Sequence, residues 1–270
     1  MIAFVQQQRG VAILTAMLVV ALGTMIAVNL MWNASLDQRR TASALAADQG
    51  LMYLQGAEAW VGDVLRQDQV DSFESDHLGE LWAAELPPMP VDGGVISGRV
   101  EDLQGRFNLN NLVTPQGEED EISRRQFERL LDTLELDPSL AGVAVDWIDP
   151  DVETGFPVGA EDSAYSSFDP PYRTPNTIIT SPSELLAMSG FEAESYRLLL
   201  PYVTALPYGT RLNVNTASAV LLASLSDDID GARGTALVEE RGAADFPDIA
   251  ATFEGDVEPD VLLRIDGVSQ

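Results

Sequence analysis

The stretch 11–32, VAILTAMLVVALGTMIAVNLMW, constrains this chain most, because it carries no charged side chain and directly follows Arg9-Gly10. A helix rises about 1.5 Å per residue, so these roughly 22 residues reach about 33 Å, enough to cross a hydrocarbon core about 30 Å thick. A cleaved secretory signal would instead have an apolar region of about 7–15 residues followed by a small-residue cleavage site. No such site comes before Asp37. The sequence therefore predicts a membrane span that the mature protein keeps.

The helix is expected to continue beyond the membrane. Residues 35–66 contain no proline and are rich in alanine, leucine and glutamine, all good helix formers. Apolar residues recur there at spacings of three and four, as one stripe that would pack on a soluble head: Leu51, Leu54, Ala57, Val61 and Leu65. Span and extension together give a helix of roughly 55 residues, about 80 Å long. A coiled coil is the alternative, although the stripe covers few heptads.

Composition narrows the functions open to the rest of the chain. The 270 residues are enough for one or two soluble domains beyond the span. The formal net charge of −28 argues against nucleic-acid binding, because a phosphate backbone would be repelled. Cysteine is absent and His77 is the only histidine, which argues against disulfides, thiolate sites, serine-type triads and multi-histidine zinc sites. A glycosidase-like carboxylate pair would arise by chance among so many acids, so we expect no enzyme.

A small sheet is predicted after the long helix. The prolines between 87 and 90 end any helix, and Asp92-Gly93-Gly94 is a tight-turn signal. Alternating apolar residues in 95–112 predict two strands hinged at Gln104-Gly105. A long helix would then lie on a small antiparallel sheet.

Helical patterns dominate the following residues. The predicted features are an apolar face of Phe127, Leu130, Leu131 and Leu134, a second helix from Asp137-Pro138 to Trp147, a capping box at 181–184 that opens a helix ending at Gly190, and a helix at 194–200. The phrase R-x-N-x-N occurs at 106–110 and again at 211–215. This is a weak internal repeat.

The second copy of that phrase leads into residues similar to the helix-hairpin-helix units of DNA-binding proteins. Such units hold phosphate on backbone amides at a glycine hairpin, usually with lysines nearby. Here the hairpin, residues 226–231, reads SDDIDG. Its three aspartates would repel phosphate, so we expect a structural role.

The best candidate for site chemistry is the loop between Trp147 and Ser181, which is rich in aspartate, glutamate, proline and glycine. A loop of more than 30 residues inside a compact domain is usually functional or ordered by a ligand. Hard oxygen donors in a flexible loop suit calcium, although the EF-hand order of ligands is missing. A solvated acidic loop is the alternative from composition alone. We expect His77 to be a turn residue rather than a ligand.

The junction Arg9-Gly10 followed by Val11-Ala12-Ile13 resembles the signal of prepilins and pseudopilins, which is cut after the glycine. The resemblance implies cleavage between Gly10 and Val11 and methylation of the new amino terminus. Most pseudopilins carry glutamate at the fifth mature position, where this chain has Thr15. That glutamate neutralises the amine of a neighbouring subunit, since an unpaired charge in lipid is expensive. Its absence is typical of a tip subunit.

Several further motifs resemble the pseudopilin K family of the type II secretion system. They are DHLGE-x-W at 76–82, GRFNLN at 105–110, the DWIDPD to PPYR loop at 146–173 and LNVNTAS at 212–218. The resemblance implies calcium as the cofactor, with Asp149, Asp151, Glu161 and Asp162 as ligands. It also implies an α+β fold, in which a pilin-like long N-terminal helix lies on a small antiparallel sheet with a large inserted α-helical domain.

The resulting domain expectation has five segments: a leader at 1–10, the long helix at 11–66 with its span at 11–32, the first part of the head at 67–113, the helical insertion at 114–205 with the acidic loop at 149–180, and a second hairpin unit with the return to the head at 206–270. Family members continue beyond this point, so we expect a truncated head.

The resemblance implies a minor pseudopilin at the tip of the type II secretion pseudopilus, helping to initiate and cap the fibre. Its partners would be other minor pseudopilins, the major pseudopilin, the prepilin peptidase and the inner-membrane assembly platform. It would cross the bacterial inner membrane once, with its head in the periplasm. The alternative is a membrane-anchored periplasmic calcium-binding interaction module outside any fibre.

Overall fold

The computed structural model describes residues 9–71 and 74–269. The predicted leader lies largely outside the described residues, at 1–8. The chain divides into two compact units, one formed by residues 1–62 with 88–97 and the other by residues 63–87 with 98–270. The five-segment division expected from the sequence stays a prediction.

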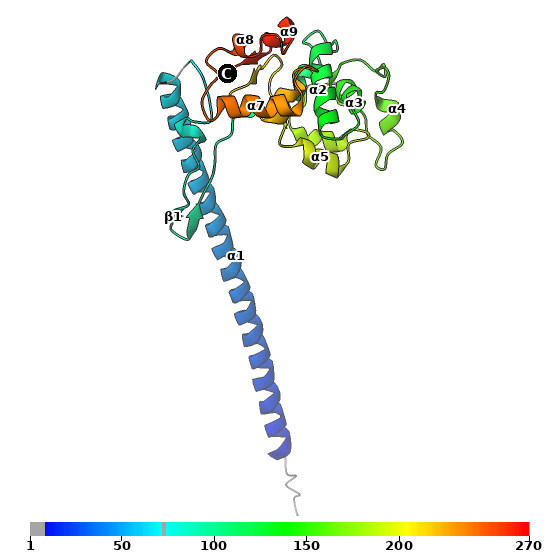
Figure 1. The fold of residues 1–270 in the computed structure, drawn as a ribbon. Helices are drawn as coiled ribbons and strands as arrows, with labels where there is room; N and C mark the ends of the chain where they lie inside the picture. The colour runs from blue at the N-terminus through cyan, green and yellow to red at the C-terminus, as the bar shows by residue number, and fades with distance from the viewer. Residues whose placement is uncertain (1–8, 72–73, 270) are drawn as a thin grey trace, which may run out of the picture. The chain divides into compact units, whose positions relative to one another are not determined.

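A single helix, α1 (Arg9–Asp71), forms the first part of the chain (Figure 1). Its 63 residues give a length of about 95 Å at 1.5 Å per residue. It is long and apolar enough to cross a membrane, with a mean hydropathy of 2.6 in its most apolar window and none of that window buried. The helix runs further than the roughly 55 residues expected, because no proline or glycine follows Arg66 before Asp71.

A short antiparallel hairpin accompanies α1 in the first unit. Strands β1 (Met89–Val91) and β2 (Gly94–Ile96) pair across the predicted Asp92-Gly93 turn, where Gly93 has a φ of +87°. Such a φ favours glycine, which explains the turn. The Asp92 carbonyl accepts a hydrogen bond of 3.2 Å from Nε2 of Gln49 on α1.

The second unit contains two short parallel strand pairs. Strand β3 (Phe107–Asn108) pairs with β4 (Val203–Thr204), and β5 (Leu212–Asn213) pairs with β6 (Ile265–Asp266). Parallel pairs need long crossover connections, and here helical segments supply them. Each R-x-N-x-N phrase thus contributes one strand of a parallel pair.

The two strands expected to hinge at Gln104-Gly105 are not formed as a pair, and that prediction was wrong. Residues Leu103–Gly105 form a 3₁₀ turn, capped by Oδ1 of Asp102, which accepts the Gln104 N–H at 2.8 Å. A Cβ on Gly105 would lie 2.6 Å from Oγ1 of Thr216, so the backbone approaches a distant segment closely at this residue. The sequence predicted a hinge at Gly105, whereas the absence of a side chain there allows this close packing.

Eight short α-helices follow α1 in the described residues of the second unit. Their bounds are α2 (Glu121–Thr133), α3 (Leu140–Ile148), α4 (Asp162–Tyr165), α5 (Ala193–Leu199), α6 (Ala219–Ser224), α7 (Gly231–Arg241), α8 (Ile249–Thr252) and α9 (Pro259–Leu262). The predicted face of α2 is confirmed, since Phe127, Leu130 and Leu131 are fully buried. The predicted capping box at Ser181 and Glu184 is also confirmed, although it opens a 3₁₀ segment.

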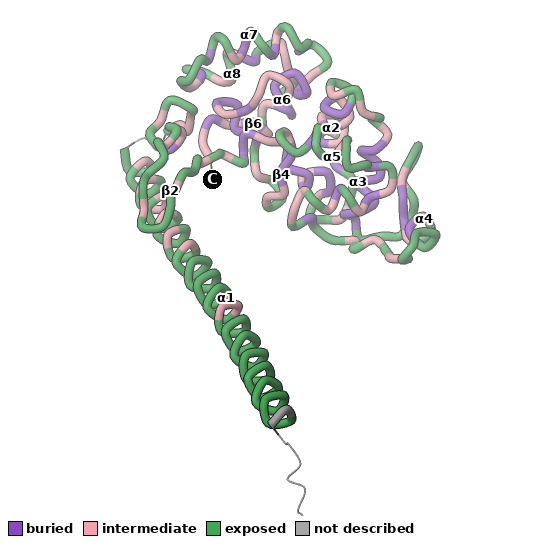
Figure 2. The backbone as a smooth tube through the Cα atoms, turned by 90° about the horizontal axis from the view of Figure 1, so that it is seen from below, coloured by how far each residue is buried: buried purple, intermediate pink, exposed green. Residues whose placement is uncertain are grey.

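One hydrophobic core joins these helices and strands (Figure 2). The rings of Phe107 on β3 and Phe127 on α2 stack at 5.2 Å with an interplanar angle of 6°. The first asparagine of each repeated phrase caps the second, because Oδ1 of Asn108 accepts the Asn110 N–H and Oδ1 of Asn213 accepts the Asn215 N–H, at 3.2 and 3.0 Å. The weak repeat in the sequence is therefore a repeat of local structure.

The α6–α7 hairpin is the unit that resembles DNA-binding hairpins. Asp230 caps α7, accepting the Arg233 N–H at 2.7 Å through Oδ1. A carboxylate thus occupies the helix terminus at which such units bind phosphate. Arg241, at the other end of α7, is buried and donates to the carbonyls of Val214 and Ala217.

The expected α+β class is confirmed. The chain combines a long N-terminal helix with small sheets and a helical insertion.

Candidate metal centre

The acidic loop between α3 and the capping box is built around aromatic side chains. Tyr165 on α4 lies 5.5 Å from Trp147 and 5.2 Å from Tyr172, measured between ring centroids. Tyr172 donates its hydroxyl proton to the Ala187 carbonyl at 2.6 Å, and the Tyr165 oxygen accepts the Ser189 N–H at 3.2 Å. Burial raises the pKa of Tyr165 to about 12. The loop is therefore packed against the hydrophobic core and is not merely solvated.

Three of the four predicted ligands come together on this core. Asp149, Asp151 and Glu161 each offer one carboxylate oxygen within 4.8 Å of the others. Helix ends hold two of them, because Asp149 follows the last residue of α3 and Glu161 precedes the first residue of α4. Asp149 and Glu161 are 8% and 3% exposed, whereas Asp151 is exposed. The group is thus open to solvent on the Asp151 side.

Several oxygens at this site have no hydrogen-bond partner. Oδ1 of Asp149 and Oε1 of Glu161 are both buried and unpaired. The Asn176 Oδ1 atom is also buried and unpaired, while its Nδ2 donates to the Asp151 carbonyl. Leaving buried acceptors unpaired destabilises a protein, by about 1–3 kcal/mol each. Hard oxygen donors in this state suit a calcium ion, which accepts six to eight of them.

The electrostatics of the group favour a cation. The pKa of Asp149 is raised from 3.8 to about 7, first by burial and then by the charges of Asp151, Asp146 and Glu161. Burial likewise raises the pKa of Glu161, while its hydrogen bond from Thr174 lowers it. Both shifts arise because negative charge is concentrated where water is scarce. A divalent cation would relieve that repulsion, so the residues present fit the ion.

The fourth predicted ligand lies outside this group. Oδ1 of Asp162 accepts hydrogen bonds from the backbone N–H and the hydroxyl of Thr174, both at 3.2 Å. Its Oδ2 faces the guanidinium of Arg173 at 3.6 Å. Protein donors therefore surround Asp162, and its role as a ligand stays a prediction.

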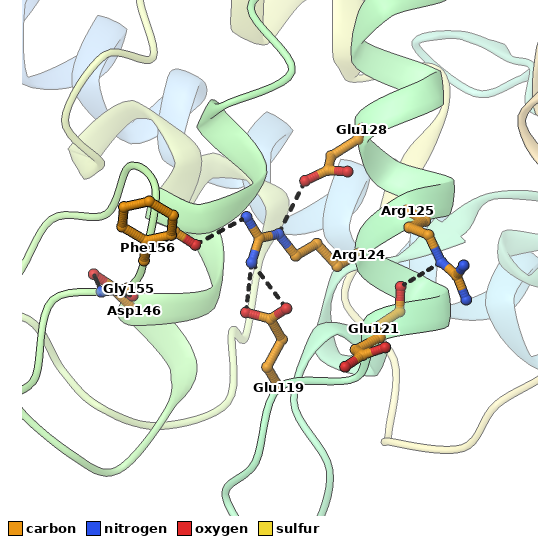
Figure 3. Close-up of polar contacts among 8 residues, drawn as sticks. All are labelled: Glu119, Glu121, Arg124, Arg125, Glu128, Asp146, Gly155 and Phe156. Atoms are coloured by element: carbon orange, nitrogen blue, oxygen red, sulfur yellow. Dashed lines mark hydrogen bonds and ion pairs between the residues drawn. The ribbon is translucent and has the colours of Figure 1, made fainter.

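Asp146, near the end of α3, holds the middle of the loop through hydrogen bonds. It is 1% exposed, and both its carboxylate oxygens accept the Gly155 N–H, at 3.2 and 3.1 Å. Burial raises its pKa. On the neighbouring helix, Arg124 pairs with Glu119 and donates to the Phe156 carbonyl at 3.5 Å (Figure 3). These contacts fix the middle of the loop to α2 and α3.

Asn176 and Asp146 were missed as site residues by reasoning from the sequence. Carboxylates mark possible ligands in an acidic loop, whereas an amide oxygen near the end of the loop gives no comparable signal. Asn176 has a φ of +46°, a left-handed conformation that asparagine tolerates better than most residues. Asp146 lies within α3, and the sequence does not distinguish it from the acids of the loop that follows.

A second acidic group lies around the C-terminal end of α1, and the predicted processing site lies at its N-terminal end. Asp68, Asp76 and Glu80 also offer oxygens within 4.8 Å of one another. His77 beside them forms a turn, its Nδ1 lying 3.1 Å from the Gly79 nitrogen and 3.0 Å from the Ala243 carbonyl oxygen. Gly10 and Val11 both lie within α1, and cleavage between them stays a prediction.

Comparison with known proteins gives consistent matches. Residues 105–208 and 212–261 each match a family model described as type II secretion system (T2SS), protein K. The type II secretion system protein K of Pseudomonas aeruginosa is 39% identical over 249 residues, covering 88% of this chain and 74% of that protein. The protein K of Aeromonas hydrophila is 37% identical over 236 residues, covering 82% of this chain and 71% of its own.

A solved structure is similar as well. A chain in the crystal structure of the GspK-GspI-GspJ complex from the enterotoxigenic Escherichia coli type 2 secretion system superposes with a TM-score of 0.75 and 26% sequence identity. The match covers 85% of each chain. The structural similarity therefore extends over most of the chain and is not confined to the acidic loop.

Proposed function

This chain belongs to the type II secretion system protein K family of minor pseudopilins, and on that premise we propose that it sits at the tip of the pseudopilus, where it caps the fibre and helps initiate its assembly. The observation that supports this most is that an uncharged residue, Thr15, occupies the fifth position after Gly10. Its hydroxyl donates to the Ala12 carbonyl of its own helix at 3.0 Å. Because threonine is uncharged, the position offers no carboxylate to the amine of a subunit above it, and a tip subunit has no such neighbour.

Helix α1 supports assembly with other pseudopilins. Its large apolar side chains are exposed along the span, including Leu14, Leu18 and Leu22 at 68%, 62% and 51%. In lipid or in a fibre, such a surface packs against further helices. In the solved complex, GspK is joined to GspI and GspJ, and we propose equivalent minor pseudopilins as partners here. The major pseudopilin, the prepilin peptidase and the assembly platform complete the proposed set.

We place the chain in the bacterial inner membrane, with one span and a periplasmic head. Cleavage after Gly10 would leave α1 attached, since the cut comes before the apolar stretch begins at Val11. The chain then acts as a structural component with no catalytic step. Its helical insertion would make the head too wide for a repeating subunit.

We propose calcium as the ion held by Asp149, Asp151 and Glu161, with the amide oxygen of Asn176 as a further ligand. The unpaired buried oxygens and the raised pKa of Asp149 support this. Bound calcium would neutralise the carboxylates and join the ends of α3 and α4 to the loop between them. Asp162 stays the fourth predicted carboxylate.

The position in the fibre can be tested by labelling. Pseudopili are overproduced in cells that contain the full chain with an epitope on its head, and then decorated with gold-conjugated antibody. We expect label at one end of each fibre and fewer fibres in cells lacking the chain. Label along the sides would contradict a capping role, and no label on fibres would favour a membrane-anchored calcium-binding module instead.

A further inference from the structure

The segment 155–159, Gly-Phe-Pro-Val-Gly, is held unusually firmly for the middle of a loop. The Gly155 N–H donates to both oxygens of the buried Asp146, and a Cβ on Gly159 would clash with the same carboxylate. Two glycines thus seat the segment on one buried side chain. Any larger residue at either position would lift it away.

Two helices also hold this segment. The Phe156 carbonyl accepts a hydrogen bond from the Arg124 guanidinium on α2 (Figure 3). A Cβ on Gly142 of α3 would clash with the Val158 carbonyl, so the backbone of the segment lies directly on that helix. The backbone is therefore ordered on both sides of Phe156.

The side chain of Phe156 nevertheless points away from the protein. It is 89% exposed, more than any other large hydrophobic side chain in the part of the chain that the structure describes. Val152 and Val158, on either side of it in sequence, are 69% and 43% exposed. We call residues 152–158 the Phe156 tip. Nothing in the folding of this chain needs an aromatic ring at that position.

A rigid backbone with a projecting aromatic ring is a favourable arrangement for binding another protein. Aromatic side chains that fill a pocket contribute much of the energy of protein interfaces. Ordering a flexible loop on binding would oppose association, but this segment is already ordered by Asp146 and Arg124. The Phe156 tip would therefore bind a partner without the entropy cost of ordering a flexible loop.

The charges around the tip restrict what can cover it. Glu153 is exposed beside Val152, and the nearby guanidinium of Arg124 is paired with Glu119 and Glu128 in ion pairs of 2.8 and 2.9 Å. With a formal net charge of −28, a second copy would be repelled, as would an anionic lipid surface. A partner with basic residues would be attracted instead.

We propose that the Phe156 tip is a docking site for a folded protein that offers an apolar pocket for one aromatic ring, with arginine or lysine around its rim. This goes beyond the place of the chain in the pseudopilus, because the tip belongs to the helical insertion and does not involve α1. The partner would be recognised by ring shape and opposite charge together.

Photo-crosslinking in cells with a working secretion system tests the surface. A benzophenone amino acid replaces Phe156 in the full chain, and replaces Leu263 in a matched control, since Leu263 is 69% exposed on another element. We expect one discrete protein adduct from position 156, lost in isolated membranes as NaCl rises from about 0.1 to 0.5 M, the range over which exposed charges are screened. An adduct to lipid or to a second copy, a salt-independent adduct, or none beyond the control would overturn the proposal.

A functional readout keeps the test independent of crosslinking. Phe156→Ala and Glu153→Lys should each lower export of a secreted reporter at least about threefold, which corresponds to a loss of roughly 0.7 kcal/mol. Phe156→Trp should restore export, and Leu263→Ala should leave it unchanged. All four variants should accumulate in the membrane and melt as the wild type does. Normal export by Phe156→Ala would remove the docking site and leave the fibre role intact.

Discussion

Asn110 and Ile179 bond each other through two reciprocal hydrogen bonds. The Asn110 Oδ1 atom accepts the Ile179 N–H at 2.7 Å, and its Nδ2 donates back to the Ile179 carbonyl at 2.9 Å. The same Nδ2 also donates to the Leu206 carbonyl at 2.9 Å. One buried side chain therefore ties the end of the acidic loop and the strand region after β4 to the first R-x-N-x-N phrase.

Removing this side chain should destabilise the fold strongly. In Asn110→Ala, the buried N–H and carbonyls of Ile179 and Leu206 lose their partners, at a cost of about 2–4 kcal/mol. For a unit of this size, each kcal/mol lowers the midpoint of thermal unfolding by about 2–4 °C. We expect a midpoint about 4–16 °C lower for the detergent-solubilised full chain, measured by near-UV circular dichroism.

The exposed Gln116 provides the control for this substitution, because it is an amide outside the core. Gln116→Ala should change the midpoint by less than about 1 °C, as surface substitutions do. Equal midpoints for the two variants would show that the Asn110 bonds contribute little to stability.

Calcium should stabilise the chain measurably. Saturation at about 100 times the dissociation constant adds about 2.7 kcal/mol, which would raise the midpoint by about 5–10 °C over the chelated protein. Asp149→Asn should abolish most of this rise, because it removes a buried carboxylate ligand. The exposed Asp132 is the matched control, and Asp132→Asn should keep the full effect. An unchanged midpoint under chelation would exclude the ion.

The stability of the chelated protein should depend on pH through Asp149. Its pKa is 3.8 in the unfolded chain and about 7 in the folded one, so the native state holds an extra proton between these values. The contribution of Asp149 to stability is therefore greatest at low pH and falls as pH rises toward 7, with no further change above it. In chelator, the wild type should lose more stability than Asp149→Asn between pH 5 and pH 8, as measured by thermal unfolding. Parallel pH curves would contradict the shifted pKa.

Long local patterns in the sequence anticipated the largest features of the structure. The uncharged stretch predicted α1, because apolar composition and the absence of proline act over dozens of neighbouring residues. The Ser181 capping box and the Asp92 turn were predictable for the same reason, since their hydrogen bonds join residues close in sequence. Each of these features depends on a continuous stretch of the sequence.

Features that join distant residues were not predictable in the same way. The pairing of Phe107 with Val203 depends on how the whole helical insertion returns, and no local pattern records it. Four ligand positions came from resemblance, and the structure brings three of them together because helix ends carry Asp149 and Glu161. Asn176 donates to the Asp151 carbonyl from a left-handed backbone conformation, which its neighbours in sequence do not reveal.

The most direct test of the account is the intact mass of the mature protein, purified from membranes of cells that contain a prepilin peptidase. We expect a chain that starts at Val11, carries one added methyl group and keeps all of α1. Cells without the peptidase should yield the chain from Met1. A mature form that starts at Met1 in both strains, or that is released from the membrane without α1, would contradict a pseudopilin.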